Sequence, residues 1–132
     1  MSNNFTIEII TPTTQMDLGS ANYLRLPGIH GLFGVMKNHT ASLVSLGIGE
    51  IKIEKSDSTE YWATSGGVLD FNNNKAQLLL ETVEQSSDID IERAEHSQDR
   101  AKKRLNDVKK DRVRSEMALA KAINRLKVGK RS

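Results

Sequence analysis

The sequence predicts an α+β fold in which an N-terminal antiparallel β-sandwich is followed by a C-terminal antiparallel hairpin of two helices. The composition changes near residues 85–87, because all six aromatic residues, both prolines and eight of the nine glycines come before this point. The charge changes at the same place, from −4 before it (5 − 9) to +6 after it (14 − 8). We therefore assign 1–84 to a β-sandwich domain and 88–132 to a helical hairpin domain.

Alternating apolar residues predict the strands of the first part. Phe5, Ile7 and Ile9 fall on one face of an extended segment, and residues 51–53 repeat the pattern. Turn-forming residues recur between such segments at intervals typical of hairpins, which favours a compact sandwich. Three leucines at 78–80 interrupt the alternation. We expect this last strand either to be covered on both faces or to lie at an edge capped by the helical tail.

The second part is expected to be helical, because after Asp88 it contains a single glycine, Gly129, and no proline. Ser87 and Asp90 resemble a capping box and predict the start of the first helix. The turn between the two helices is predicted at three polar residues, Asn106, Asp107 and Asp111.

Each predicted helix carries one apolar stripe. The first stripe is narrow and consists mostly of small residues: Ala94, Ala101, Leu105 and Val108. The second is broader: Val113, Met117, Ala120, Ile123 and Leu126. At ~25 cal/mol per Å², a pair of such helices buries too little apolar area to be stable alone, so it needs a partner surface on the sandwich or on another subunit. If these two surfaces differ by only a few kcal/mol, the hairpin can exchange between them.

Several kinds of chemistry find no support in the sequence. No cysteine is present, and His30, His39 and His96 lack the paired carboxylates that a zinc or iron site would use. Residues 28–34 contain three glycines, but they lack the GxGxxG spacing and no helix follows them. We expect this run to be a loop with positive φ at several glycines. The apolar pair at 32–33 on such a loop indicates contact with a partner.

A basic stripe is predicted on the second helix, opposite its apolar stripe. Its members, Arg114, Lys121 and Arg125, fall within one quadrant of a helical wheel. Such a stripe suits an acidic protein surface or the phosphates of a nucleotide. It equally leaves open a different function, in which a basic helical hairpin binds nucleic acid or an anionic membrane surface.

Three local patterns occur along the chain in a specific order. They are GLFGV at 31–35 followed by Asn38, His39, Leu46 and Gly49, then SGG at 65–67, then IDIERA at 89–94. In this order they resemble the epsilon subunit of bacterial F-type ATP synthases, over essentially the whole chain. Met36 and Lys37 stand where that family usually has Leu-Pro, and Ala41 stands where it usually has a second proline. These departures predict a less rigid loop.

The resemblance implies a non-catalytic subunit of the central stalk, or rotor, of a proton- or cation-translocating ATP synthase. It implies a ten-stranded sandwich bound to the gamma subunit and to the c-ring of the membrane sector. The hairpin would inhibit ATP hydrolysis when it extends along gamma and its basic stripe meets the alpha and beta catalytic subunits. Such a subunit is peripheral, on the cytoplasmic face of the bacterial inner membrane, with no nucleic-acid partner. The residues expected to contact the c-ring are Gly31, Leu32, Phe33 and His39.

The resemblance also implies that the folded-down hairpin binds ATP, as a regulatory ligand and not as an obligatory cofactor. The matching positions are Glu84, Asp90, Arg93, Ala94, Arg100, Lys121 and Arg125. Arg93 and Arg100 would clamp phosphate oxygens, while Asp90 or Glu84 would accept hydrogen bonds from adenine or ribose. Lys121 replaces an arginine of the strong ATP binders, so a bidentate contact becomes a point charge. The alternative is that Asp90 only caps the helix and Arg93 pairs with a nearby acid.

Overall fold

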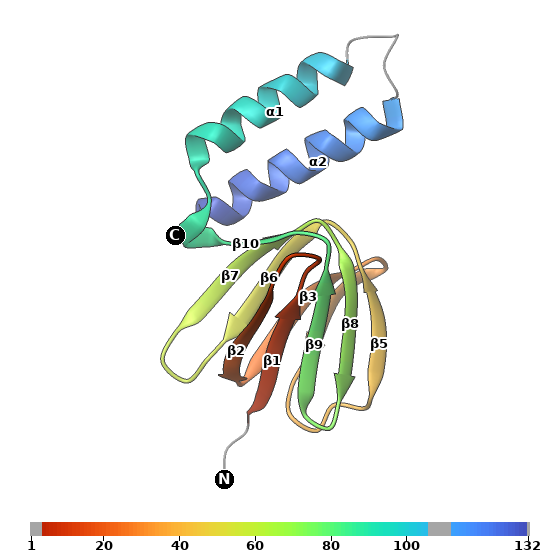
Figure 1. Cartoon of the computed structure of the whole chain (residues 1–132), viewed down its shortest axis with the longest axis vertical. Helices are drawn as coiled ribbons and strands as arrows, with labels where there is room; N and C mark the ends of the chain where they lie inside the picture. The colour runs from red at the N-terminus through yellow and green to blue at the C-terminus, as the bar shows by residue number, and fades with distance from the viewer. Residues whose placement is uncertain (1–3, 106–111, 132) are drawn as a thin grey trace.

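The structure, a computed structural model, describes residues 4–105 and 112–131, and a helical hairpin stands over one end of a β-sandwich (Figure 1). The strands within these residues are β1 (Phe5–Ile10), β2 (Gln15–Ala21), β3 (Tyr23–Gly28), β4 (Gly31–Val35), β5 (Ser42–Leu46), β6 (Gly49–Glu54), β7 (Thr59–Thr64), β8 (Gly67–Asn72), β9 (Lys75–Leu80) and β10 (Val83–Gln85). A 3-10 turn η1 (Ser86–Asp88) leads to helices α1 (Ile91–Leu105) and α2 (Arg112–Gly129). The predicted fold class is confirmed.

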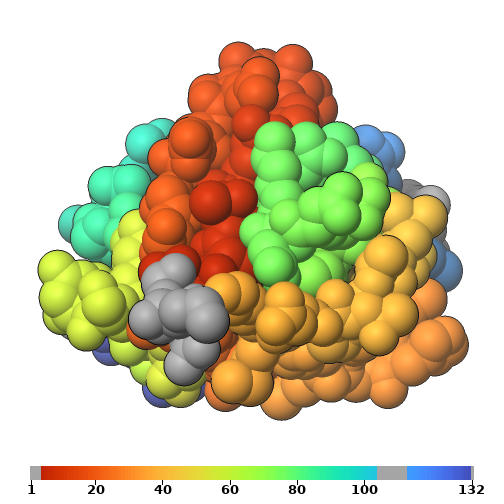
Figure 2. Space-filling view, turned by 90° about the horizontal axis from the view of Figure 1, so that it is seen from below, coloured from red at the N-terminus to blue at the C-terminus, as the bar shows by residue number. Residues whose placement is uncertain are grey.

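The strands form one continuous sheet that folds over on itself. Its order is β10-β7-β6-β3-β5-β8-β9-β1-β2, and β4 pairs with β3. Most neighbours are antiparallel, as predicted, but β1 and β9 are parallel. The first strand therefore lies beside a late one, and Figure 2 shows the red N-terminal segment next to the green hairpin of β8 and β9.

The core lies between the two layers of the folded sheet. Phe5, Ile7 and Ile9 are buried together, as their alternation predicts, and Ile51 and Ile53 are buried with them. The Phe5 ring meets the buried Phe71 ring edge to face, with 5.6 Å between the centroids. Strand periodicity thus identified the inward face of both segments correctly.

The three leucines of β9 do not behave as expected. Leu78 and Leu80 are buried, whereas Leu79 is 43% exposed. The strand lies inside the sheet between β8 and β1, not at an edge, and β10 follows it. Both expectations for residues 78–80 are therefore wrong. The run keeps the period of two of an ordinary strand, with one leucine on its solvent face.

The glycine run at 28–34 is a tight hairpin between β3 and β4, not an open loop. Of its glycines only Gly31 has a positive φ, 129°. The other two are required by close approach: a Cβ on Gly28 would lie 2.7 Å from the Gly31 carbonyl oxygen, and one on Gly34 would lie 2.9 Å from the Tyr23 hydroxyl. The expectation of positive φ at several glycines is wrong, because crowding explains two of the three.

The segment after β4 is held by side-chain contacts and not by prolines. The Asn38 backbone N–H donates to Asn74 Oδ1 at 2.7 Å, and Asn74 Nδ2 donates to Asn38 Oδ1 at 3.2 Å. The His39 ring stacks edge to face against Phe33 and against Phe71, at 5.4 and 5.8 Å. These contacts restrain the segment, although it contains no proline.

The start of helix α1 differs from the prediction, which placed it at Ser87. Ser87 lies in η1, and the carboxylate of Asp90 is the cap, because its Oδ1 accepts the backbone N–H of Arg93 at 3.1 Å. The residues predicted to turn the chain, Asn106, Asp107 and Asp111, lie outside the described residues, as does Val108. No helix in the described part of the chain is long and apolar enough to cross a membrane.

The apolar stripe predicted for α2 faces mainly solvent. Val113, Met117 and Ile123 are 67%, 50% and 46% exposed, and only Leu126 of the predicted stripe is buried. Four buried positions of the helix pair are small, Ala94 and Ala101 on α1 and Ser115 and Ala122 on α2, and Leu126 and Val128 are buried near the end of α2. Small residues let two helices approach closely, while the bulkier side chains of Val113, Met117 and Ile123 remain uncovered.

Neighbouring leucines of β9 provide a test of this packing. We expect Leu78→Ala to lower the free energy of unfolding by about 2–5 kcal/mol, because it opens a cavity in the core. Leu79→Ala is the matched control, and we expect it to cost less than about 1 kcal/mol because the side chain is half exposed. Urea denaturation followed by circular dichroism measures both. Equal losses would contradict the assigned faces.

Candidate functional site

A cavity of about 820 Å³ opens where the end of the sandwich meets the first turns of α1. Five of the seven residues that we expected at an ATP site line it: Glu84, Asp90, Arg93, Arg100 and Arg125. Glu84 belongs to β10, Asp90 directly precedes α1, Arg93 and Arg100 belong to α1, and Arg125 belongs to α2. The cavity wall is therefore built from the sandwich and from both helices.

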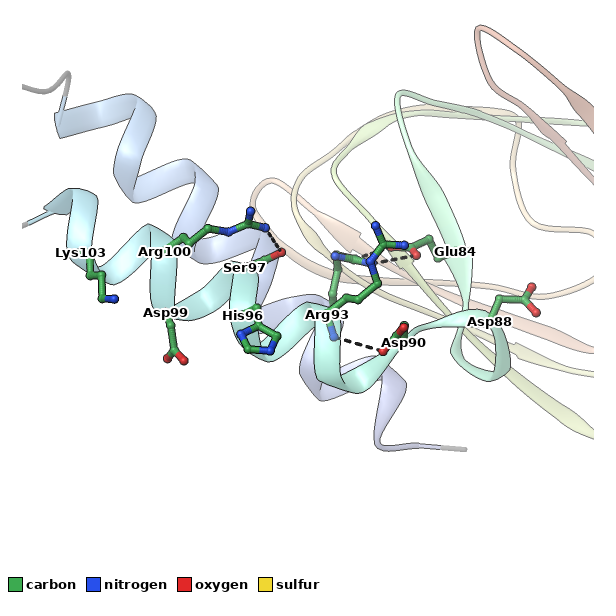
Figure 3. A pocket seen from close by; sticks show the side chains of 10 residues that line it. Glu84, Asp88, Asp90, Arg93, His96, Ser97, Asp99, Arg100 and Lys103 are labelled. Atoms are coloured by element: carbon green, nitrogen blue, oxygen red, sulfur yellow. Dashed lines mark hydrogen bonds and ion pairs between the residues drawn. The ribbon is translucent and has the colours of Figure 1, made fainter.

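The cations of α1 follow one another along the helix. Figure 3 shows Arg93, Ser97 and Arg100 in sequence along α1, and Arg100 Nη2 donates to Ser97 Oγ at 3.2 Å. Within the described residues, neither Arg93 nor Arg100 forms an ion pair with a carboxylate. The pairing of Arg93 with a nearby acid, which the sequence left open, is thus not found. Both guanidinium groups remain available to an anionic ligand.

Asp90 has a structural role at the edge of this cavity. Its Oδ1 caps α1 by accepting the Arg93 N–H, and this was the other half of the alternative reading. An aspartate cap uses one carboxylate oxygen, so the second oxygen can still accept a hydrogen bond from a ligand. Capping and ligand binding are therefore compatible at this residue.

Glu84 and Arg125 join the sandwich to α2 across the cavity wall. Arg125 Nε donates to Glu84 Oε1 at 2.5 Å and Nη2 donates to Oε2 at 3.1 Å, which is a bidentate contact. Both side chains are about one third exposed. The pair neutralises the charge of Arg125, so this residue acts here as a brace between β10 and α2 and not as a free phosphate ligand.

Two of the expected ATP-site residues lie outside this cavity. Ala94 is fully buried and packs in a small cluster with Ile89, Leu126 and Val128, where the helices meet the sandwich. Lys121 lines a neighbouring cavity of about 340 Å³, which shares Glu84 and Arg125 with the first. Five of the seven expected residues therefore line the main cavity, Lys121 lines the side cavity, and Ala94 lies in the apolar packing between the helices and the sandwich.

Sequence reasoning missed five residues of the main cavity. They are Asp88, His96, Ser97, Asp99 and Lys103. Spacing from Arg93 could have indicated His96 and Ser97, since residues three and four positions apart share a helix face. With them the lining has four carboxylates (84, 88, 90 and 99) and four cations besides His96 (93, 100, 103 and 125). Because these positive and negative charges balance, the lining as a whole does not attract an anion. An anion would have to be bound through direct contacts with individual cations.

The residues expected to contact the c-ring lie at another part of the sandwich. Leu32 is 73% exposed and, together with Ile29, Leu43 and Gly31, lines a shallow cavity of about 390 Å³. Phe33 and His39 are half-buried in their mutual ring contact instead of fully exposed. Of the predicted pair of exposed apolar residues, only Leu32 is therefore truly exposed.

The predicted basic stripe of α2 is not one open surface here. Arg114 is exposed, whereas Lys121 and Arg125 face the two cavities beside the sandwich. The apolar stripe, for which we expected a partner surface on the sandwich or on another subunit, faces solvent in this chain except at Leu126. Larger apolar residues of α2 do meet α1 near the end of the helix, where Leu126 and Val128 pack with Ala94.

Comparison with known proteins places both halves of the chain in one family. The model of the ATP synthase delta/epsilon chain β-sandwich domain matches residues 4–86, and the model of the long α-helix domain of the same chains matches residues 87–130. The match of the second model begins within η1, shortly after β10 ends. Together the two models cover nearly the whole chain.

Individual relatives agree with the family models. The chain is 35% identical over 130 residues to the ATP synthase epsilon chain of Nitratidesulfovibrio vulgaris, covering 97% of each. It is 40% identical over 116 residues to that of Salinibacter ruber, covering 81% of this chain and 78% of the relative. Its fold resembles a chain of the Euglena gracilis mitochondrial ATP synthase structure of OSCP, F1 and c-ring, with a TM-score of 0.80 at 16% identity, over 91% of this chain and 78% of that one.

The cap at the cavity edge gives a test that separates structure from ligand binding. We expect Asp90→Ala to speed hydrogen exchange in the first turn of α1, because losing such a cap costs about 0.5–2 kcal/mol. Asp90→Asn is the control, since asparagine caps as well as aspartate and only the charge is lost. Exchange detected by NMR should be nearly unchanged in Asp90→Asn. Equal acceleration in both variants would contradict the cap.

Proposed function

This chain belongs to the epsilon-subunit family of ATP synthases, and on that premise we propose that it is a non-catalytic subunit of the rotor. In this proposal the sandwich joins the gamma subunit to the c-ring, and the hairpin is a mobile brake on ATP hydrolysis that ATP holds in its docked position. One observation carries the proposal: the cavity has walls from β10, α1 and α2, so it exists only while the hairpin is docked.

ATP binding in this cavity would favour the docked hairpin by simple linkage. A ligand that binds only the docked form stabilises it by RT ln(1 + [L]/Kd), about 2.7 kcal/mol at a concentration of 100 Kd. The guanidinium groups of Arg93 and Arg100, which are free of carboxylates, support a role in binding the phosphates. Glu84 is already engaged by Arg125, so the second oxygen of Asp90 is the better acceptor for adenine or ribose.

The exposed apolar cavity near β4 supports the proposed contact with the c-ring. Ile29, Leu32 and Leu43 are all more than half exposed and lie around one depression of the surface. Clustered apolar side chains on a protein surface mark partner contacts more often than scattered ones do. Through this contact the subunit would sit peripherally at the cytoplasmic face of the membrane, with the membrane-embedded ring as its neighbour.

The alternative function, binding of nucleic acid or an anionic membrane surface, depends on free basic residues in the second half of the chain, and some of these are not free. Two arginines of the basic tail are already paired, Arg125 with Glu84 and Arg131 with Glu50. A polyanion would have to compete with both carboxylates. No observation in the described part of the chain favours this reading, so the rotor function is the one we propose.

Nucleotide binding can be tested on the isolated chain. We expect Arg93→Ala to weaken ATP binding by roughly 10- to 100-fold, because a charge-assisted hydrogen bond to a phosphate contributes about 1.5–3 kcal/mol. Lys102→Ala is the control, since Lys102 is an exposed cation of α1 that does not line the cavity. Isothermal titration calorimetry measures both affinities. Equal affinity in Arg93→Ala and wild type would remove this residue from the site.

The brake can be tested in the assembled enzyme. We expect deletion of residues 85–132 to leave a folded sandwich and to raise the ATP hydrolysis rate of the complex, because the inhibitory hairpin is gone. Circular dichroism of the truncated chain checks the fold, and a coupled ATPase assay measures the rate. A complex that incorporates the folded, truncated subunit and hydrolyses ATP at the wild-type rate would count against the brake.

A further inference from the structure

A second attachment of the hairpin lies beyond the end of α2, away from the nucleotide cavity. Arg131 Nε donates to Glu50 Oε2 at 3.0 Å, and its Nη2 lies 3.4 Å from Oε1 of the same carboxylate. The guanidinium also lies over the Tyr61 ring, 5.0 Å from its centroid, in cation–π geometry. Glu50 belongs to β6 and Tyr61 to β7, so this single arginine reaches two strands of the sandwich.

Glu50 is unusual among the carboxylates of the sandwich because its side chain is only 7% exposed. A buried carboxylate needs compensation, and a second guanidinium provides part of it: Arg25 Nη2 of β3 donates to Glu50 Oε1 at 3.0 Å. The two arginines reach Glu50 from opposite parts of the fold, Arg25 from within the sheet and Arg131 from the hairpin. Burial makes it more costly to leave such a carboxylate without a cation than to break an ordinary surface ion pair.

The chain is shaped locally to bring Arg131 to this place. Helix α2 ends at Gly129, where a Cβ would lie 2.5 Å from Ile91 Cδ1 and 3.0 Å from Ile89 Cγ2. The close packing there fixes the end of α2 against Ile89 and against Ile91, the first residue of α1. The backbone then turns, with the Arg131 N–H donating to the Val128 carbonyl at 3.0 Å. One turn earlier, Asn124 Nδ2 donates to the Gly49 carbonyl at 2.7 Å, next to Glu50 in sequence.

We propose that Arg131, Glu50 and Arg25 form a latch that holds the end of α2 on the sandwich without any nucleotide. The latch shares no residue with the main cavity and none with the Glu84–Arg125 pair. It therefore contributes to the docked population of the hairpin in the free chain independently of the cavity. Ligand binding at the cavity would stabilise the docked hairpin in addition to the latch. Loss of the latch would lower the docked population of the chain without nucleotide.

The arrangement also makes the latch releasable. When α2 leaves, Glu50 keeps its contact with Arg25, so no buried carboxylate is left without a cation. Arg131 passes into water, where an arginine is well solvated. Removing Arg131 alone should therefore favour undocking without unfolding the sandwich, which distinguishes this latch from a permanent structural ion pair.

Hydrogen exchange of the full chain, without nucleotide and without other subunits, tests the latch. We expect Arg131→Ala to increase exchange of the amides at 122–129 by roughly tenfold, the effect of losing a partly buried charged contact. Lys130→Ala is the matched control, because it removes the same charge from the adjacent, exposed position. The amides of β1, β8 and β9 should exchange as in wild type in both variants. Equal exchange at 122–129 in Arg131→Ala and Lys130→Ala would overturn the latch.

A double-mutant cycle tests the partner of Arg131. Glu50→Gln should accelerate exchange at 122–129 as Arg131→Ala does, and the double variant should add little to either. Fully additive effects would overturn the pairing.

Because Glu50→Gln also removes the partner of Arg25, a further variant, Arg131→Gln, is needed that leaves the sandwich intact. We expect its exchange at 122–129 to match that of Arg131→Ala. Wild-type protection in Arg131→Gln would overturn the role of the charge. None of these measurements involves ATP or the complex, so their outcome is independent of the proposed brake.

Discussion

The structure depends on how little of the hairpin touches the sandwich. Among the described residues, the C-terminal half of α2, the segment before α1 and the first turn of α1 meet the sheet in a small apolar cluster that includes Ala63, Ile89, Leu126 and Val128. Around this cluster, the side chains of Asn124, Arg125 and Arg131 make polar contacts to β6, β7 and β10 that hold the hairpin on the sandwich. Because the apolar contact is small, these few contacts carry a large share of the docking energy. The candidate nucleotide cavity, which needs walls from both parts, depends on them in turn.

Helix α2 cannot bury both of its apolar sides in a two-helix hairpin. Ser115 and Ala122 are buried and Leu126 and Val128 pack with Ala94 of α1, whereas its bulkier stripe is left toward water. A helix that contacts one other helix and the end of a sandwich leaves part of its surface to solvent, whereas a helix enclosed by several neighbours need not. The exposed stripe is thus a consequence of how few neighbours α2 has.

Most of the sandwich could be predicted from periodicity, and the reasons for the failures are specific. Alternation identified the buried faces of β1 and β6 because one face of each strand is in the core and the other is not. It failed at 78–80, since hydrophobicity alone does not tell a leucine on the solvent face from one in the core. The pairing of β1 with β9 depends on contacts between residues about 70 positions apart, which no local pattern encodes. The cap of α1 was misplaced because Ser87 and Asp90 are both good cap residues, and the preceding 3-10 turn decides between them.

The candidate site was predictable only in part for a related reason. A resemblance in sequence indicates which positions match those of a known ligand site, and five of these positions do line one cavity. It does not indicate which cation is already paired with a carboxylate of the same chain. The Glu84–Arg125 contact and the Arg131 latch both join segments that are far apart in sequence, 41 and 81 residues respectively. Such contacts follow from the docking of the hairpin, and sequence reasoning on each helix alone does not reach them.

The energies involved explain why a nucleotide could govern this hairpin under the proposed function. Full burial of a side chain such as Val113, Met117 or Ile123 is worth about 1.5–3 kcal/mol, and roughly half of that is still unrealised in the docked state. A partner that covered the stripe would therefore gain a few kcal/mol in total. The ionic contacts of the docked state contribute amounts of the same order, about 1–3 kcal/mol each, as does a ligand present at 100 Kd. Since no single contribution dominates, each can shift the balance between the two positions of the hairpin, and none can lock it.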